Sequence, residues 1–382
     1  MKNRLLYQWF TIKKSILLTF VALIIAGIYL IYQNLFYWSG WYGKPESFEQ
    51  LTEKWAQLEN IPGVILHINK VGKPLFVGSA GHLSLHADRL LNPSTYFHTA
   101  STSKIFTTIT ILKLHEKGLL LLDDPIATYI NKDILSGLVV VDGKDYGSEI
   151  TFRHLLTHRS GLPNSDNSIS FQFYVLSQLE RERTPAELIA FAREMPAVGK
   201  PDETTFYSSI GYMLAGLAIE GVTGQPYHKI VRGEVLEPLN MTSTFESNNE
   251  MPHGIEIAHH YFGGIDLANA DPSFEFADGG FITTTEDMAK LGSALIEGRV
   301  FANQATEAIF MTPLADGAGF GFFWERAQNG ADYFYQPGFW GVRFVVFPEQ
   351  NVVISYTLNQ SNTSTQKFLK QVTQLLVDQG HI

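Results

Sequence analysis

Strand-forming segments lie at both ends of this chain, and a long helix-forming stretch separates them. This pattern constrains the fold more than any other feature. Near the N-terminal end, residues 64–69 and 74–80 are two β-branched runs joined through a glycine turn at 71–73, which predicts a hairpin. Between the two ends, residues 105–297 are mostly helix-forming. Late in the chain, turn residues separate four short aromatic and β-branched runs at 319–324, 332–336, 342–347 and 352–357.

Strands from the two ends of a chain can share one sheet if the middle of the chain forms an insertion. We therefore predict an α/β (α+β) fold. One antiparallel sheet, built from both termini, is flanked by helices and carries an inserted α-helical lobe. Two flanking helices are expected, a lead-in helix within 44–60 and an amphipathic helix over 364–379. The chain has 382 residues, 45% of them hydrophobic, which is sufficient for a large core.

The N-terminal region has the pattern of a membrane anchor. No charged residue lies between Lys14 and Lys44, and residues 15–37 are apolar and long enough to cross about 30 Å of hydrocarbon as a helix. The flanking basic residues all precede this stretch, so the positive-inside rule keeps residues 1–14 in the cytoplasm and exports the rest. A cleaved signal peptide is the alternative. It is disfavoured because the stretch is long and no small-x-small cleavage site follows it.

We divide the chain into a basic tail at 1–14, an anchor at 15–37, a juxtamembrane segment with the lead-in helix at 38–60, and a globular domain at 61–382. It would be a single-pass protein of a bacterial cytoplasmic membrane, with the lipid bilayer as a partner and the globular domain periplasmic or extracellular. The net charge of −10 and the absence of a basic stripe argue against nucleic acid as a partner. The chain has no cysteine, which excludes disulfides, thiolate catalysis and cysteine-based zinc sites.

Ser101 and Lys104 form an S-x-x-K pair where the helix after the first hairpin is expected to begin. Spaced by three on one helical face, their Cβ atoms would lie about 5–6 Å apart, so the amine can reach the hydroxyl. A serine becomes a strong nucleophile when a neighbouring base takes its proton. We expect an unprotonated lysine amine to do so once burial or a nearby cation lowers its pKa.

Two other groups of polar residues have simpler interpretations. His154 and His158 are spaced like a zinc pair, but the glutamate of an H-E-x-x-H motif and a third ligand are missing, so we expect no metal site. Asp123 and Asp124 are expected to cap a turn and a helix. The G-x-S-x-G elbow of another large serine-hydrolase fold is absent from the sequence.

Several ordered segments together point to a known family. They are 61–64 (IPGV), 101–104 (STSK), 119–125 (LLLLDDP), 150–163 (ITFRHLLTHRSGLP), 206–209 (FYSS) and 277–288 (ADGGFITTTEDM). In order and approximate spacing, they resemble the serine β-lactamase and penicillin-recognising enzyme superfamily over roughly residues 60–360. The resemblance is closest to the branch of class C β-lactamases, D-Ala-D-Ala carboxypeptidases and family VIII-like carboxylesterases. It implies a β-lactamase/transpeptidase-like fold.

The resemblance implies a site for acyl transfer. Ser101 would be the nucleophile and Lys104 its partner. Tyr207, the first residue of the family's Y-x-N motif, would be a second base that passes a proton to the leaving group. A phenolate near a lysine ammonium is stabilised by it. The backbone amides of Ser101 and Phe339 would form the oxyanion hole, and no metal or organic cofactor would be required.

Two departures from the family pattern bear on the substrate. Ser209 stands where the family usually has asparagine, and Gln336-Pro-Gly338 stands where it has K-T-G or H-x-G. Gly338 still lets a substrate approach the backbone closely, but Gln336 offers no positive charge to a substrate carboxylate, a loss of about 1–3 kcal/mol. Arg343 would restore a cation only if a bulge at Gly338 or Gly341 redirected it, because strict strand alternation points it away from the face of Gln336.

These features predict a membrane-anchored, outward-facing serine hydrolase that works through an acyl-enzyme. Its substrate would be a small acyl compound or a cell-envelope component, cleaved as an esterase or amidase would rather than as a β-lactamase would. Two alternatives stay open. One is a D-Ala-D-Ala carboxypeptidase or penicillin-binding protein that acts on peptidoglycan. The other is an anchored binding or scaffold protein without catalysis.

Overall fold

The computed structural model describes residues 45–58, 60–71, 73–361 and 363–382. The predicted anchor at 15–37 and the tail before it lie outside the described residues. Among those that are described, no helix is both long and apolar enough to cross a membrane. Ser47–Ile382 form one compact unit, which includes the predicted lead-in helix.

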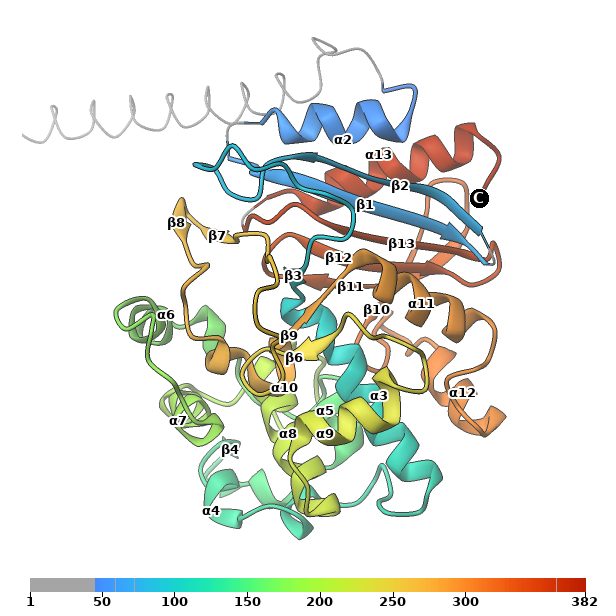
Figure 1. The fold of residues 1–382 in the computed structure, drawn as a ribbon. Helices are drawn as coiled ribbons and strands as arrows, with labels where there is room; N and C mark the ends of the chain where they lie inside the picture. Colours follow the sequence, from blue (N-terminus) through green and yellow to red (C-terminus); the bar gives the residue numbers. More distant parts are fainter. Residues whose placement is uncertain (1–44, 59, 72, 362) are drawn as a thin grey trace, which may run out of the picture. The chain divides into compact units, whose positions relative to one another are not determined.

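A six-stranded antiparallel sheet joins the two ends of the described chain, as the sequence predicted (Figure 1). The strand order is β10-β11-β12-β13-β1-β2, so the N-terminal hairpin adds to the edge of the C-terminal strands. β1 and β13 pair in register, with Ile68 opposite Ile354. The strands are β1 Gly63–Lys70, β2 Lys73–Gly81, β10 Phe323–Arg326, β11 Asp332–Gly338, β12 Val342–Phe347 and β13 Val352–Thr357.

β10 begins later than the strand predicted at 319–324. The reason lies at Gly321, whose φ of +85° belongs to the left-handed region and interrupts an extended strand. A side chain at this position would place its Cβ 2.4 Å from Thr108 Oγ1 and 2.8 Å from Tyr212 Oη. The segment before β10 therefore packs closely against the helical lobe instead of extending the sheet.

Two helices cover one face of the sheet (Figure 1). They are α2, Phe48–Ala56, and α13, Thr365–Asp378, and both match the predicted flanking helices. Trp55 joins them, since its ring meets Phe368 edge-on at 5.1 Å and its indole Nε1 donates to Gln371 Oε1 at 2.7 Å. This layer buries one face of the sheet in a core of its own.

The opposite face of the sheet packs against α11, Thr285–Ile296, and against the inserted helical lobe (Figure 1). Gly292 of α11 lies so close to the sheet that an added Cβ would meet Val353 at 2.5 Å. The other helices are α3 Lys104–Glu116, α4 Lys132–Leu135, α5 Phe152–Leu156, α6 Ile169–Leu176, α7 Pro185–Ala190, α8 Ser209–Thr223, α9 Tyr227–Val231, α10 Phe276–Gly279 and α12 Gln304–Met311.

Short strands link the lobe to the segment that carries Ser101. A three-stranded sheet has the order β3-β9-β6, and β3 leads directly into the 3₁₀ turn η1, Ala100–Ser103, before α3. The short strands are β3 Phe97–His98, β4 Val140–Val141, β5 Lys144–Asp145, β6 Phe245–Glu246, β7 Tyr261–Phe262, β8 Ile265–Asp266 and β9 Phe281–Thr283.

Candidate active site

Ser101 lies on a sharp connection between a strand and a helix. The hydroxyl Oγ1 and the backbone amide of Thr99 both donate to the carbonyl of Phe281, at 2.8 and 2.9 Å, and this fixes the end of β3. Ala100 then adopts a φ of +45°, in the left-handed region that side chains disfavour. The turn brings Ser101 to the start of α3, where the sequence placed it.

The three predicted catalytic side chains lie together. Lys104 Nζ donates to Ser101 Oγ at 3.0 Å, and Tyr207 Oη donates to the same oxygen at 2.7 Å. Lys104 is completely buried and also donates to the backbone carbonyl of Asp278 at 2.8 Å, with the Asp278 carboxylate Oδ2 at 3.4 Å. Ser101 is thus held between a cationic donor and a phenol.

The expectation of an unprotonated Lys104 is wrong. Burial by itself lowers the pKa of Lys104, but the neighbouring phenol of Tyr207 and carboxylate of Asp278 outweigh burial and raise the pKa above its ordinary value. Lys104 is therefore an ammonium that donates hydrogen bonds to Ser101 and Asp278. Sequence reasoning missed this because Asp278 is 174 residues away along the chain.

The ring of His158 packs against the ring of Tyr207, a contact that the sequence did not indicate. The two ring centroids are 4.6 Å apart, and His158 is 3% exposed. Burial and, to a smaller extent, the charge of Lys104 lower the pKa of His158 to about 3, so the ring is neutral. His154, its partner in the zinc-like spacing, instead contacts Asp202 Oδ2 through Nε2 at 3.1 Å.

A cavity of about 670 Å³ opens beside Ser101 and Tyr207. Most of its wall is aromatic or aliphatic and comes from α6, from the loops before α10, and from the ends of β10 and β11. A few polar side chains interrupt this apolar wall. The lining residues used below are Asp166, Phe171, Val175, Glu275, Asp278, Phe323, Gly338, Phe339 and Trp340.

Gly338 lets the end of β11 approach the segment that carries Ser101. A Cβ at this position would lie 2.5 Å from the carbonyl oxygen of Thr99 and 3.4 Å from Thr102 Cγ2. Phe339 follows at the cavity wall, half exposed, with its ring stacked on Phe262 at 5.7 Å. The assignment of the amides of Ser101 and Phe339 as oxyanion-hole donors stays a prediction.

Gln336 and Arg343, predicted to bind substrate, are not among the described residues that line the cavity. Gln336 is fully buried opposite Phe344, so its side chain shares the face of the sheet that packs on the lobe. Arg343 points to the other face, where Nε donates to Thr365 Oγ1 at 3.0 Å and the guanidinium lies 4.8 Å from the ring centroid of Tyr335. The β11–β12 register is regular, so strand alternation holds and no bulge redirects Arg343.

Comparison with known proteins shows to which family this chain belongs. The model of the beta-lactamase family matches residues 48–377. The chain belongs to the beta-lactamase family. Family membership supports the predicted fold and the predicted enzyme class, a serine hydrolase.

The individual relatives have a low sequence identity to this chain. The Staphylococcus aureus (strain MRSA252) protein named flp is 29% identical over 64% of this chain, and the match spans 47% of that protein, so the chain spans about half the length of such curated relatives. The octameric penicillin-binding protein homologue of Pyrococcus abyssi is 26% identical, with a TM-score of 0.73 over 85% of this chain and 75% of that one. The D-stereospecific amidohydrolase of a Streptomyces species is 25% identical, with a TM-score of 0.71 over 84% of this chain and 96% of that one.

Ser209, at the family's asparagine position, is buried and donates from Oγ to Asp166 Oδ2 at 2.6 Å. Asp166 lines the cavity and Ser209 is not among the described lining residues, so the Ser209 hydroxyl acts on the cavity only by holding the Asp166 carboxylate. Glu275 also lies at the cavity wall, where its Oε1 accepts from the indole of Trp340 at 3.0 Å. Together with Asp278, these carboxyl groups are site residues that sequence reasoning missed.

The sequence held partial signals for two of the three carboxyl residues. Asp278 lies inside the matched segment 277–288, and Asp166 comes three residues after the matched segment 150–163. Glu275 has no comparable signal, because it lies in a loop turn that only the fold brings to the cavity.

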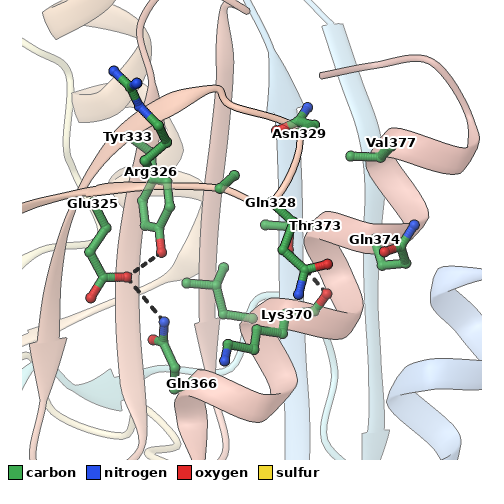
Figure 2. A pocket seen from close by; sticks show the side chains of 12 residues that line it. Glu325, Arg326, Gln328, Asn329, Tyr333, Gln366, Lys370, Thr373, Gln374 and Val377 are labelled. Atoms are coloured by element: carbon green, nitrogen blue, oxygen red, sulfur yellow. Dashed lines mark hydrogen bonds between the residues drawn. The ribbon is translucent and has the colours of Figure 1, made fainter.

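A second cavity of about 380 Å³ lies between the β10–β11 hairpin and α13 (Figure 2). Glu325 at its wall accepts hydrogen bonds from the hydroxyls of Tyr333 and Tyr335 and from Gln366 Nε2. The two cavities share no described lining residue. This groove lies apart from the Ser101 hydroxyl.

Proposed function

We propose that this member of the beta-lactamase family hydrolyses esters or amides through an acyl-enzyme on Ser101, as an esterase or amidase rather than as a β-lactamase. The observation that carries the proposal is the hydrogen-bonded chain from Lys104 through Ser101 to Tyr207 at the wall of a cavity of about 670 Å³. A nucleophile, a proton carrier and room for a substrate are the requirements of acyl transfer.

The proton steps follow from the protonation of Lys104. As an ammonium, Lys104 cannot take the Ser101 proton. The base is then Tyr207, which has to enter the reaction as a phenolate, a form that a nearby ammonium stabilises in general. Ser101 Oγ attacks the carbonyl carbon as its proton passes to the Tyr207 oxygen, and Tyr207 then protonates the departing alcohol or amine. A water molecule attacks the acyl carbon and gives a proton to Tyr207, which returns it to Ser101 as the acid leaves. The amides of Ser101 and Phe339 would hold the oxyanion.

The charges at the cavity wall favour substrates without a carboxylate. None of the described lining residues is a lysine or an arginine, and Gln336 and Arg343 lie elsewhere. A carboxylate in this cavity would meet the carboxyl groups of Asp166, Glu275 and Asp278 without a lining cation. Efficient turnover of β-lactams, which carry a carboxylate, is therefore not expected.

A second candidate is a peptidase of the penicillin-binding kind that acts on peptidoglycan. It is favoured by the likeness to the Pyrococcus abyssi penicillin-binding protein homologue, at 26% identity. The Streptomyces amidohydrolase, at 25%, supports amide cleavage as the alternative reaction. The two candidates differ in whether the substrate ends in a carboxylate.

We also propose that residues 15–37 anchor the chain in a bacterial cytoplasmic membrane and that residues 45–382 act on its outer side. The support is the uncharged apolar stretch and the basic residues that precede it. A cell-envelope component would then be within reach of the cavity.

One labelling experiment tests the catalytic proposal. The full chain and its Ser101→Ala variant are incubated separately with a fluorophosphonate probe and with a fluorescent penicillin. Labelling of the wild type by the fluorophosphonate alone supports an esterase or amidase, and labelling by both reagents supports the penicillin-binding alternative. Labelling that persists in Ser101→Ala, or no labelling at all, contradicts the proposal and favours a scaffold without catalysis.

A further inference from the structure

The cavity beside Ser101 is lined by three carboxyl side chains. Asp166, Glu275 and Asp278 all line it. The nearest cation, Lys104, lies behind Ser101 and is already engaged by the backbone and carboxylate of Asp278. None of the described lining residues is itself a cation.

Apart from the contact between Lys104 and Asp278, no hydrogen bond that the described residues make to these carboxyl groups comes from a cation. Asp166 accepts from the neutral hydroxyl of Ser209, and Glu275 accepts from the neutral indole of Trp340. The side chain of Asp278 is 10% exposed, and its Oδ1 has no hydrogen-bond partner among the described residues. Buried carboxyl groups are normally paired with a cation, so this arrangement lacks a partner that a ligand could supply.

The pKa directions agree with a missing cation. Burial, and then the neighbouring Asp278, raise the pKa of Glu275 well above its ordinary value. Burial raises the pKa of Asp278 to about 7, although Lys104 acts in the opposite direction. A cation that entered the cavity would favour the ionised form of both groups.

An organic ammonium fits these carboxyl groups better than a metal ion does. In the described part of the chain, no group of three or more histidine, aspartate or glutamate side chains is arranged to hold a metal. The rest of the wall is aromatic and aliphatic, including Phe171, Val175 and Phe323. A small organic molecule with an apolar body and a cationic head fits both parts of the wall.

We propose that the substrate of Ser101 carries a protonated amine close to its scissile carbonyl, and that Asp166 and Glu275 bind this amine. The inference rests on the proposed hydrolase function and names the chemical class of its substrate. Asp166 and Glu275 are assigned as its main partners because Oδ2 of Asp278 is already paired with Lys104, and the unpartnered Oδ1 of Asp278 is open to the same amine. Ser209 and Trp340 act as positioning residues, since each holds one of the two carboxyl groups at the wall.

Four thioesters that differ in charge test this assignment on the full chain in detergent. They are the benzyl thioesters of alanine (both enantiomers), propionate, N-acetylalanine and succinate, each compared with its own hydroxide-catalysed rate. Released thiol is measured with a disulfide reagent, which the protein itself does not consume because it has no cysteine. We expect kcat/KM, corrected for intrinsic reactivity, to be at least about tenfold higher for one alanine enantiomer than for the propionate and N-acetylalanine esters. The succinate ester should be the poorest substrate.

Charge-removing variants assign the effect to residues. Asp166→Asn and Glu275→Gln should each lower the preference for the alanine ester over the propionate ester by about tenfold, mainly through KM. Glu349→Gln is the matched control, because it removes one charge at an exposed turn after β12. It should leave the preference unchanged.

The outcomes separate this inference from the proposed function. If no ester is hydrolysed in a Ser101-dependent manner, the proposed function fails. If the propionate ester is hydrolysed through Ser101 but the alanine ester has no advantage, or the succinate ester is preferred, only the amine assignment is overturned. Should both variants fail to fold, the comparison of the four thioesters with the wild-type chain still tests the amine assignment.

Discussion

At the scale of single residues, the reactivity of Ser101 depends on neighbours that are far away along the chain. The serine–lysine spacing correctly predicted that the two side chains meet, with Lys104 Nζ 3.0 Å from Ser101 Oγ. It could not predict the protonation of Lys104, because Tyr207 and Asp278 come from other parts of the chain and together reverse the effect of burial on the pKa. We therefore propose Tyr207 as the residue that moves protons.

Removal of the Tyr207 hydroxyl should separate catalysis from stability. In Tyr207→Phe we expect kcat to fall by about 10²–10⁴, the usual contribution of a general acid–base group. The ring remains packed on His158, so the free energy of unfolding should change by less than about 1 kcal/mol. Steady-state kinetics with a neutral ester and urea unfolding measure the two quantities. A kcat close to that of the wild type would exclude Tyr207 as the proton carrier.

His158 should make the protein sensitive to acid. The folded state keeps His158 neutral down to a pKa of about 3, whereas the ordinary value is 6.5, so the unfolded chain binds a proton that the folded chain excludes. Stability is therefore lost as the pH falls below 6.5, by about 3 kcal/mol from this residue between pH 6.5 and 4.

The variant His158→Asn isolates this contribution. Asparagine tolerates the φ of +57° at this position, and its side chain can accept the Ser208 amide that His158 Nδ1 now accepts at 3.3 Å. Urea unfolding at pH 7.5 and pH 4 should show that the wild type loses about 3 kcal/mol more than the variant. Equal losses would mean that His158 is protonated in the folded state. Glu275 and Asp278, whose raised pKa values act in the opposite direction, are common to both proteins and cancel.

At the scale of secondary-structure elements, the site depends on how closely β11 approaches η1. Gly338 permits this approach, because a Cβ would lie 2.5 Å from the carbonyl oxygen of Thr99. In Gly338→Ala we expect a loss of about 1–3 kcal/mol in the free energy of unfolding, as in other overpacked sites. We also expect a loss of at least about tenfold in kcat/KM, because the Phe339 amide directly follows β11.

Gly233→Ala is the control for this substitution. Gly233 lies in the helical turn Arg232–Leu236, and among the described residues, apart from its chain neighbours and the backbone of its own helix, no atom lies within 4 Å of the position that its Cβ would take. Alanine there should be neutral or stabilise by about 0.5–1 kcal/mol, with unchanged kinetics. If both variants behave alike in thermal unfolding and ester hydrolysis, the close approach of β11 is not important for the site.

Most elements followed from the sequence, and the exceptions have physical reasons. Hydrophobic periodicity located β1, β2 and α13, and strand alternation correctly placed Arg343 on the face opposite Gln336. The start of β10 was missed because Gly321 packs against Thr108, a contact that no local pattern reveals. The carboxyl groups at the cavity wall were missed for the same reason, since they come from separate loops that only the fold brings together.

At the scale of the whole molecule, the anchor at 15–37 remains a prediction from sequence and lies outside the described residues. The full chain should sediment with membranes and need detergent for release. A chain that begins at residue 45 should stay in solution with the same kcat/KM for a neutral ester, because the compact unit begins at Ser47. Recovery of both chains in the soluble fraction would contradict the anchor.

Direct capture of the acyl-enzyme tests the central claim. The full chain is mixed with the benzyl thioester of pivalate, whose hindered acyl group is released slowly, then quenched in acid and analysed by peptide mass spectrometry. We predict one pivaloyl group per chain, on the peptide that contains Ser101, and none in Ser101→Ala. A pivaloyl group on any other side chain, or thioester hydrolysis at the wild-type rate by Ser101→Ala, would show that Ser101 is not the nucleophile.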